Sequence, residues 1–295
     1  MEESSLATPP PAIEESSPLA LIATISVCIG FPVLLLLQQR GLLPWKQLGA
    51  EALGSALFKA FVFTAGLTAT HNEWEPSYAI VFTLATVWLC IVCIAFPLGA
   101  HCNSAVTVGV MASGQLSPVH ALLYMLAQHA GCALAVEGLR FAIPPSLLHA
   151  ISPMKPPGSS SLLGACGIEM LFTGLNVLLA LGNSIFSSHK AKATASLVLV
   201  LILTAKLVTE GGASLDPTGA FAEAYFARDF EYLKLYWTCS LIGATISGLV
   251  YRELFLSTGG RGRAAGSNVK RAHRDSSANA FMRIVGIWHV FVAQE

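Results

Sequence analysis

Long runs of apolar residues limit what this chain can fold into more than any other feature. A helix needs about 20 mostly apolar residues to cross a bilayer, and the 295-residue sequence holds several stretches of that kind. They lie near residues 18–37, 48–70, 77–98, 119–142, 161–182, 193–210 and 232–256. Because lipid offers the backbone no hydrogen-bond partner, these seven stretches predict an all-α, multi-pass membrane protein.

Composition narrows the functional class. The chain is 54% hydrophobic and 12% charged with zero formal net charge, so no basic field indicates a nucleic-acid partner. We find no nucleophile–base pair, metal-ligand cluster or phosphate loop, and therefore expect neither an enzyme nor a cofactor or metal. The seven cysteines fall mostly in apolar stretches rather than polar loops, so we expect no disulfide framework. Cys90 and Cys93 are interpreted as two small packing residues on one helix face.

The first span has an acidic flank in the N-terminal tail, residues 1–17. We interpret residues 18–40 as a retained extra helix, with a cleaved signal sequence as the alternative. Basic residues follow the first, fifth and seventh spans: Arg40 and Lys46; His189, Lys190 and Lys192; Arg261, Arg263, Lys270, Arg271 and Arg274. With seven spans these clusters share one face, which predicts an outside N-terminus and a cytosolic C-terminus, in the plasma membrane or an intracellular membrane.

The sequence also repeats itself. In the first half Glu51 is followed by the run 99–107, then by Tyr124 and Gly131; in the second half Glu169 is followed by the run 211–220, then by Tyr236 and Gly243. Three spans in each half imply two copies of opposite topology, with the functional site where the copies meet. We predict a first repeat at 48–142, a Pro-rich connection at 143–160, a second repeat at 161–256 and a basic tail at 257–295.

Each repeat holds an apolar piece too short to cross, at about 103–113 and about 216–226. Asn103 and Asp216 are good N-cap residues, and Pro217 suits a first helical position. About ten helical residues span roughly 15 Å, half of a bilayer core. Two such half-helices would meet at the bilayer centre, and their dipoles would admit neutral molecules and repel cations.

At these residues the chain resembles a divergent branch of the aquaporin family over about residues 48–256. The run 99–107 is similar to the first Asn-Pro-Ala box, with Ser104 where proline is usual, and Asp216-Pro217-Thr218 stands in the second box. Gly219 replaces an arginine that normally narrows the outer pore. The resemblance implies an aquaporin-like inverted repeat of six spanning helices and two re-entrant half-helices, here with an extra N-terminal span, and a homotetramer.

The resemblance also implies the site residues. The pore caps are Asn103, Ser104, Ala105, Asp216, Pro217 and Thr218; the loop supports are Glu51, Glu169 and His101; the selectivity filter is Thr83, Thr204, Ala213 and Gly219. A filter of small neutral residues implies a passive channel for water and solutes such as glycerol, urea, ammonia or hydrogen peroxide. His101 is either a gate or a loop anchor, and Cys102, beside the expected constriction, is a candidate target of thiol reagents.

Charged residues leave alternatives open. Asp216 is either protonated or heavily hydrogen-bonded, or the pore excludes cations less well than its relatives do. Lys59 lies in mid-span with no evident partner, although Glu137 and Glu51 are candidates, and Lys206 is expected to reach the membrane surface. The rival functions are an ion-coupled transporter that uses Asp216, Glu51 or Lys59, and an aquaporin-like protein that does not conduct.

Overall fold

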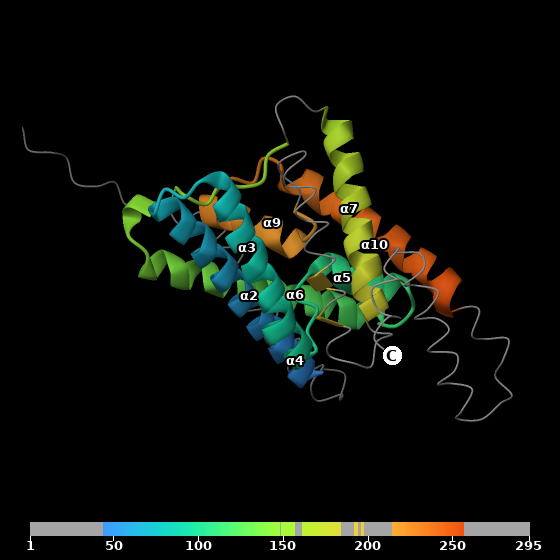
Figure 1. Ribbon diagram of the computed structural model, residues 1–295. Helices are drawn as coiled ribbons and strands as arrows, with labels where there is room; N and C mark the ends of the chain where they lie inside the picture. The colour runs from blue at the N-terminus through green and yellow to red at the C-terminus, as the bar shows by residue number, and fades with distance from the viewer. Residues whose placement is uncertain are drawn as a thin grey trace, which may run out of the picture. The chain divides into compact units, whose positions relative to one another are not determined.

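The computed structural model describes residues 44–147, 149–156, 161–183, 192–193, 196–197 and 214–256. The chain divides into two units, Met1–Trp45 and Lys46–Glu295, and the described elements belong almost wholly to the second. They are α2 (Trp45–His71), α3 (Pro76–Cys90), η1 (Ile91–Ala95), α4 (Phe96–Leu98), α5 (Ser104–Ala112), α6 (Pro118–Ala142), η2 (Pro145–Leu147), α7 (Leu162–Asn183), α9 (Pro217–Ala227), α10 (Leu233–Tyr251) and η3 (Arg252–Leu256) (Figure 1). Every regular element in these ranges is a helix, as the sequence predicts.

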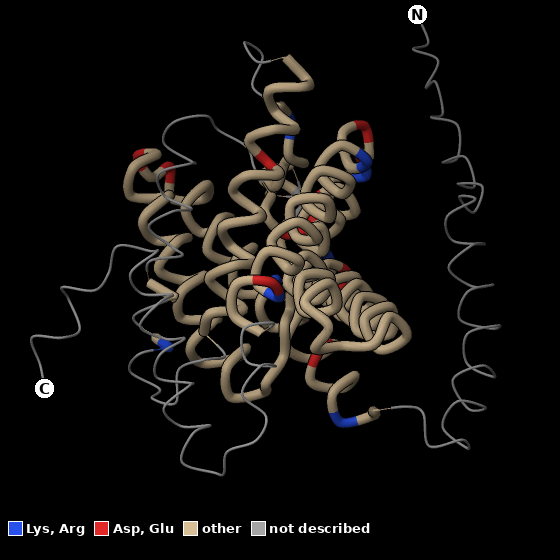
Figure 2. Tube along the Cα trace, turned by 90° about the vertical axis from the view of Figure 1, so that its right-hand side faces the viewer, with Lys and Arg blue, Asp and Glu red and all other residues tan. Residues whose placement is uncertain are grey.

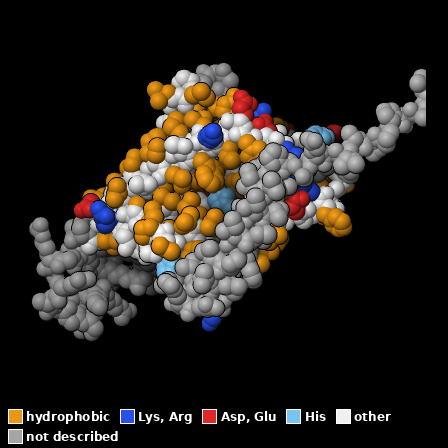
Figure 3. Space-filling model, turned by 180° about the vertical axis from the view of Figure 1, so that it is seen from behind, with side chains coloured by type: hydrophobic (Ala, Val, Ile, Leu, Met, Phe, Trp, Pro, Cys, Tyr) orange, Lys and Arg blue, Asp and Glu red, His pale blue; other side chains and the backbone are white. Residues whose placement is uncertain are grey.

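Five helical segments within the described ranges are long and apolar enough to cross a membrane. They are Trp45–His71, Pro76–Leu98, Pro118–Ala142, Leu162–Asn183 and Leu233–Leu256, each within a few residues of a predicted span. Charged residues are sparse along them (Figure 2), and apolar side chains cover much of the visible described surface (Figure 3). The predicted span 18–37 lies outside the described residues, and so does 193–210 apart from 193 and 196–197.

Helix starts follow from local sequence. α3 begins with Pro76 at its first position, and the Glu75 carboxylate accepts a bond from the backbone N–H of Ser77 at 3.1 Å. α6 begins in the same way with Pro118, and the Ser117 hydroxyl accepts from the N–H of His120 at 3.2 Å. In each case a polar side chain satisfies an N–H that the helix leaves unpaired, and proline has no N–H to satisfy.

One tight helix crossing occurs in both halves. A Cβ atom added to Gly131 in α6 would lie 2.0 Å from the carbonyl oxygen of Ala52 in α2. A Cβ atom on Gly243 in α10 would lie 2.2 Å from the carbonyl oxygen of Met170 in α7. Ala52 and Met170 each follow the buried glutamate of their own half. The repeat seen in the sequence is therefore also a repeat in packing.

Each half-helix packs against spans of the other half. α5, from the first half, contacts α7 and α10, and α9, from the second half, contacts α6 (Figure 1). Glycine permits close main-chain contact here, since a Cβ on Gly248 of α10 would lie 2.4 Å from the carbonyl oxygen of Gly109 in α5. The apolar cluster around Ala105, Val108 and Val177 fills the same interface. The exchange joins the two halves and brings their half-helices together.

The cysteines differ from expectation in two places. Cys166 in α7 and Cys239 in α10 form a disulfide, so the expectation of no disulfide is wrong for this pair. The tight crossing of these helices explains it, because it brings the two Cα atoms to 5.5 Å. Cys90 is buried but Cys93, in the π-helical turn that follows, is exposed, so only Cys90 packs inside the described bundle.

Candidate functional site

The site is built around the N-terminal ends of α5 and α9. Asn103 caps α5, and its Oδ1 accepts from the N–H of Ala105 at 2.7 Å and of Val106 at 3.3 Å. Asp216 caps α9, and its Oδ1 accepts from the N–H of Thr218 at 3.0 Å. Both helices therefore begin at the residues that the sequence indicates, with side chains in place of the missing backbone acceptors.

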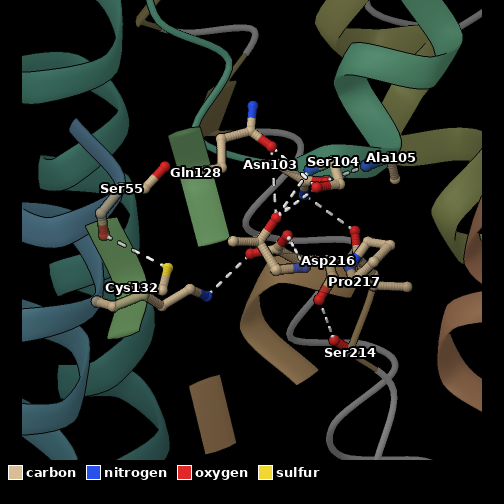
Figure 4. A network of polar contacts seen from close by, with 12 residues as sticks. Ser55, Asn103, Ser104, Ala105, Gln128, Cys132, Ser214, Asp216 and Pro217 are labelled. Carbon is tan, nitrogen blue, oxygen red and sulfur yellow. Dashed lines mark hydrogen bonds and ion pairs between the residues drawn. The ribbon is translucent and has the colours of Figure 1, made fainter. Parts of the chain in front are cut away.

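The two helix tips bond directly to each other (Figure 4). The Asn103 amide Nδ2 donates to the carbonyl oxygen of Leu215 at 3.0 Å, across 112 residues of chain. The N–H of Ser104 donates to the Thr218 hydroxyl at 3.1 Å, and the two hydroxyl oxygens lie 2.7 Å apart. Two positive helix ends therefore converge on one place.

A buried carboxylate holds the loop before α5. Glu51 of α2 accepts from the N–H of His101 at 2.8 Å and from the N–H of Cys102 at 3.0 Å. The Gln128 amide adds a third bond at 2.9 Å. Cys102 has a φ of 52°, a left-handed conformation that is uncommon for residues other than glycine. The two bonds to the carboxylate stabilise the loop in this conformation.

The second half repeats this arrangement. Glu169 of α7 accepts from the N–H of Ser214 at 3.1 Å and from the N–H of Leu215 at 2.9 Å. The Ser240 hydroxyl of α10 also donates to Glu169. Leu215 has a φ of 51°, matching Cys102 in the other half. Each helix cap is thus preceded by a left-handed residue whose N–H bonds to a buried glutamate.

Gln128 connects the helix tips to Glu51, and the sequence did not identify it as a site residue. Its Oε1 accepts from the Ser104 hydroxyl at 2.9 Å, and its Nε2 donates to the Thr107 hydroxyl at 2.9 Å as well as to Glu51. The Asn176 amide of α7 similarly donates to the carbonyl of Leu215 at 3.3 Å. A polar amide inside an otherwise apolar span was the available signal.

Lys59 pairs with the tip of the opposite half. Its Nζ lies 2.9 Å from Oδ2 of Asp216, and the two side chains are 9% and 13% exposed. The sequence-based candidates Glu137 and Glu51 are wrong: Glu137 pairs with Arg140 at 3.1 Å, and Glu51 holds the first loop. Because Lys59 lies about two helical turns beyond Glu51 along α2, it extends past the first tip towards the second.

The predicted filter is only partly described. A Cβ on Gly219 would lie 2.5 Å from Nζ of Lys59 and 3.0 Å from Oδ2 of Asp216, so Gly219 lies beside the ion pair. Thr83 lies in α3 and is partly buried. Thr204 and Ala213 lie outside the described residues. Lys206, Gly211 and Gly212 do so as well.

His101 and Cys102 lie in the loop that enters α5. Nδ1 of His101 is 3.0 Å from the Thr107 hydroxyl, and its ring centroid is 5.7 Å from that of Tyr124. These contacts suit an anchor for the loop, and gating stays a hypothesis. The Cys102 thiol is buried, and a Cβ on Gly54 of α2 would lie 2.7 Å from its sulfur.

A cavity of about 840 Å³ lies at the C-terminal end of α9, lined in part by Arg140, Phe226 and Asp229. The Arg140 guanidinium donates to two carbonyls in the last turn of α9, those of Tyr225 and Phe226, at 3.0 and 2.6 Å. The backbone N–H of Glu231, together with the Lys155 ammonium 3.2 Å away, lowers the pKa of Asp229 below its ordinary value. The cavity wall therefore carries both signs of charge.

Comparison with known proteins gives one consistent result. A family model described as Major intrinsic protein matches residues 38–251. The chain is 28% identical to the lens fiber major intrinsic protein of Gallus gallus, covering 79% of this chain and 90% of that one. It is 29% identical to aquaporin TIP4-1 of Zea mays, covering 66% and 81%. The X-ray structure of the aquaglyceroporin from Plasmodium falciparum has the same fold, with a TM-score of 0.59 at 20% identity over 72% of this chain and 97% of that one.

Proposed function

This chain belongs to the major intrinsic protein family, and we propose that it is a passive channel for water and small neutral solutes. It is a multi-pass integral membrane protein. The observation that carries the proposal is the junction of α5 and α9, whose tips are joined by the bonds from Asn103 to Leu215 and from Ser104 to Thr218. Two half-helices that meet end to end leave a polar, non-lipid centre inside an apolar bundle.

The pore is proposed to pass beside these tips and through a filter of Thr83, Thr204, Ala213 and Gly219. None of the four carries a ring or a charge. A filter of this kind removes fewer waters from a solute and leaves more space than one with an arginine, so glycerol, urea, ammonia and hydrogen peroxide are proposed cargo besides water. The cavity at the end of α9 fits an outer mouth of this pore.

Orientation and assembly extend the proposal. The basic residues after the first, fifth and seventh predicted spans support a cytosolic C-terminus, in the plasma membrane or an intracellular membrane. The apolar faces of the spans would contact lipid or neighbouring copies, and a homotetramer with one pore per subunit is the proposed assembly. Cross-linking in native membranes tests the assembly, and protease access to a C-terminal tag tests the orientation.

Two rivals remain from the sequence, an ion-coupled transporter and a non-conducting relative. The residues that a coupling ion would need are engaged within the protein: Glu51 holds backbone N–H groups, and Lys59 and Asp216 pair with each other. These contacts support the channel.

The test is stopped-flow swelling of proteoliposomes in gradients of glycerol, urea and other neutral solutes. A channel gives swelling that follows the solute gradient alone and ignores sodium or proton gradients. Dependence on either ion gradient would favour the transporter. Swelling no faster than in empty liposomes with every solute would favour the non-conducting relative.

A further inference from the structure

The tip of α9 carries a charge that the tip of α5 lacks. Two helix N-termini together present roughly one positive charge at the point where they meet. An ionised Asp216 at that point would cancel this charge and remove the barrier to cations. The carboxylate also has no N–H to offer a permeating molecule, whereas an amide does. A second group is therefore needed if the centre is to repel cations.

Lys59 meets this requirement. The Asp216 carboxylate is shared between two partners, since Oδ1 caps the N–H of Thr218 at 3.0 Å and Oδ2 lies 2.9 Å from the Lys59 ammonium. Both side chains are largely but not completely buried, at 9% and 13% exposed. The pair lies at the helix tips, with a small part of each side chain accessible to water-sized molecules. The Lys59 ammonium therefore offsets the negative charge of Asp216 at the helix tip.

Gly219 provides the space that the lysine occupies. Any side chain at this position would begin with a Cβ 2.5 Å from the Lys59 nitrogen, closer than atoms can approach without bonding. The family resemblance implies an arginine at position 219. Here the position holds a glycine, and the positive charge comes from Lys59 of α2 in the other half of the molecule.

A further acidic side chain lies on the same side of α9. Asp216, Gly219 and Glu223 follow one another at intervals of three and four residues, so they share a helix face. Oε2 of Glu223 is buried and has no hydrogen-bond partner among the described residues. The other titratable groups near Lys59 or Asp216 on the described elements are the ring of His129 and the thiols of Cys132, Cys90 and Cys102. Lys59 is therefore the one cation among the groups that face the pair from the described elements.

We propose that Lys59 is a selectivity residue of this channel: its ammonium, held on Asp216 in the space beside Gly219, supplies the positive charge that keeps cations out of the pore. The inference rests on the proposed channel function and adds the residue that determines its charge selectivity. It also assigns the two unusual residues of the second box a joint role. Asp216 binds the Lys59 ammonium, and Gly219 leaves the space that the ammonium occupies.

The first test is Lys59→Met in the full chain, reconstituted in proteoliposomes. Potassium flux and glycerol swelling are measured on the same preparation, and their ratio is compared with that of the wild type. Removing the ammonium leaves an uncompensated carboxylate, so the potassium-to-glycerol ratio should rise at least about tenfold. Lys46→Met, which removes an exposed lysine near the start of the same helix, is the matched control and should leave the ratio unchanged. An unchanged ratio in Lys59→Met would overturn the proposal.

The second test completes a mutant cycle. Asp216→Asn leaves the lysine uncompensated, so the chloride-to-glycerol ratio should rise and the potassium ratio should not. The double variant Lys59→Met/Asp216→Asn buries no unpaired charge and should return both ratios towards wild type. A potassium leak in the double variant equal to that of Lys59→Met would overturn the proposal, as would a potassium leak in Asp216→Asn.

The cycle remains decisive if Lys59→Met alone does not assemble, because the chloride preference expected of Asp216→Asn and its loss in the double variant still separate the outcomes. If wild-type liposomes swell with glycerol and Lys59→Met remains impermeable to potassium, only the proposed role of Lys59 is refuted. A wild type that passes no neutral solute refutes the channel, and the lysine's role in it fails as well.

Discussion

The two helix tips are built on the same backbone plan but carry different chemistry. In each half a buried glutamate accepts two backbone N–H groups, the second of them from a left-handed residue, and a polar cap follows. The first cap, Asn103, uses its amide to bond the opposite tip, whereas the second, Asp216, accepts a lysine from the opposite half. The two halves therefore share the same backbone arrangement, whereas the cap side chain differs between them. A charged cap is compatible with this arrangement when a partner of opposite charge compensates for it.

Removing the buried glutamates should have the largest effect. Glu51→Ala leaves the N–H groups of His101 and Cys102 and the Gln128 amide without their acceptor, and each such loss costs about 1–3 kcal/mol. Glu169→Ala removes the acceptor of two N–H groups as well, but its other donors include hydroxyls, which can rotate towards new partners. We expect both variants to lose the assembled channel, Glu51→Ala more completely, as judged by size-exclusion chromatography in detergent and by glycerol swelling.

Glu137→Ala is the matched control for these variants, because this glutamate is 53% exposed and forms a surface pair with Arg140. Such pairs contribute at most about 1 kcal/mol. If Glu169→Ala assembled and conducted as well as Glu137→Ala, the supports of the two tips would not be equivalent, and the shared backbone plan would apply only to the first half.

The paired glycine crossings should have the next largest effect. Gly131→Ala and Gly243→Ala each force a methyl group against a main-chain carbonyl, at 2.0 and 2.2 Å in the present packing. Overpacking of this kind costs about 1–3 kcal/mol, which a lower unfolding temperature in detergent would reveal. Gly138→Ala on α6, where nothing lies within 4 Å, is the control and should be neutral or slightly stabilising. A loss at Gly131 with none at Gly243 would show that the second crossing can separate.

The far ends of the half-helices differ in how they are capped. The Arg140 guanidinium, from the first half, donates to two carbonyls at the end of α9. Ser113 caps the C-terminal end of α5, and its hydroxyl donates to the carbonyl of Val110 in the last turn of that helix at 2.8 Å. A hydrogen bond from a charged group contributes about 1.5–3 kcal/mol and a neutral one about 1 kcal/mol. Arg140→Met should therefore speed hydrogen exchange at the end of α9 more than Ser113→Ala does at the end of α5; equal effects would contradict this asymmetry.

Much of the fold was predictable because it depends on features that are local in sequence. Apolar length indicates the spans, N-cap residues indicate where the half-helices begin, and the recurrence of Glu, Tyr and Gly indicates the inverted repeat. The five described spans and the family are confirmed. The roles of the pore and filter residues stay predictions, and two filter positions, Thr204 and Ala213, lie outside the described residues.

The contacts between halves could not be predicted, because they depend on how the helices cross. Lys59 was recognised as anomalous, but its partner Asp216 belongs to the other repeat, and nothing in the sequence around position 59 indicates position 216. The Gln128–Ser104 bond and the Cys166–Cys239 disulfide each lie within one half, and they were missed because they too depend on how the helices cross. Spacing along one helix shows which face a residue occupies and leaves open which helix covers that face.

The residues before the two caps should give the smallest difference between the halves. Cys102 and Leu215 share a left-handed backbone conformation, and only Cys102 carries a thiol. Cys102 is 4% exposed and lies against Gly54, so a mercurial should react slowly and inhibit glycerol swelling only in part. Cys102→Ser should abolish that inhibition, whereas Cys93→Ser, which removes an exposed thiol on the π-helical turn, should not. Full mercurial sensitivity in Cys102→Ser would place the reactive thiol elsewhere. Because Leu215 cannot react, any inhibition lost with Cys102 reports on the first tip alone.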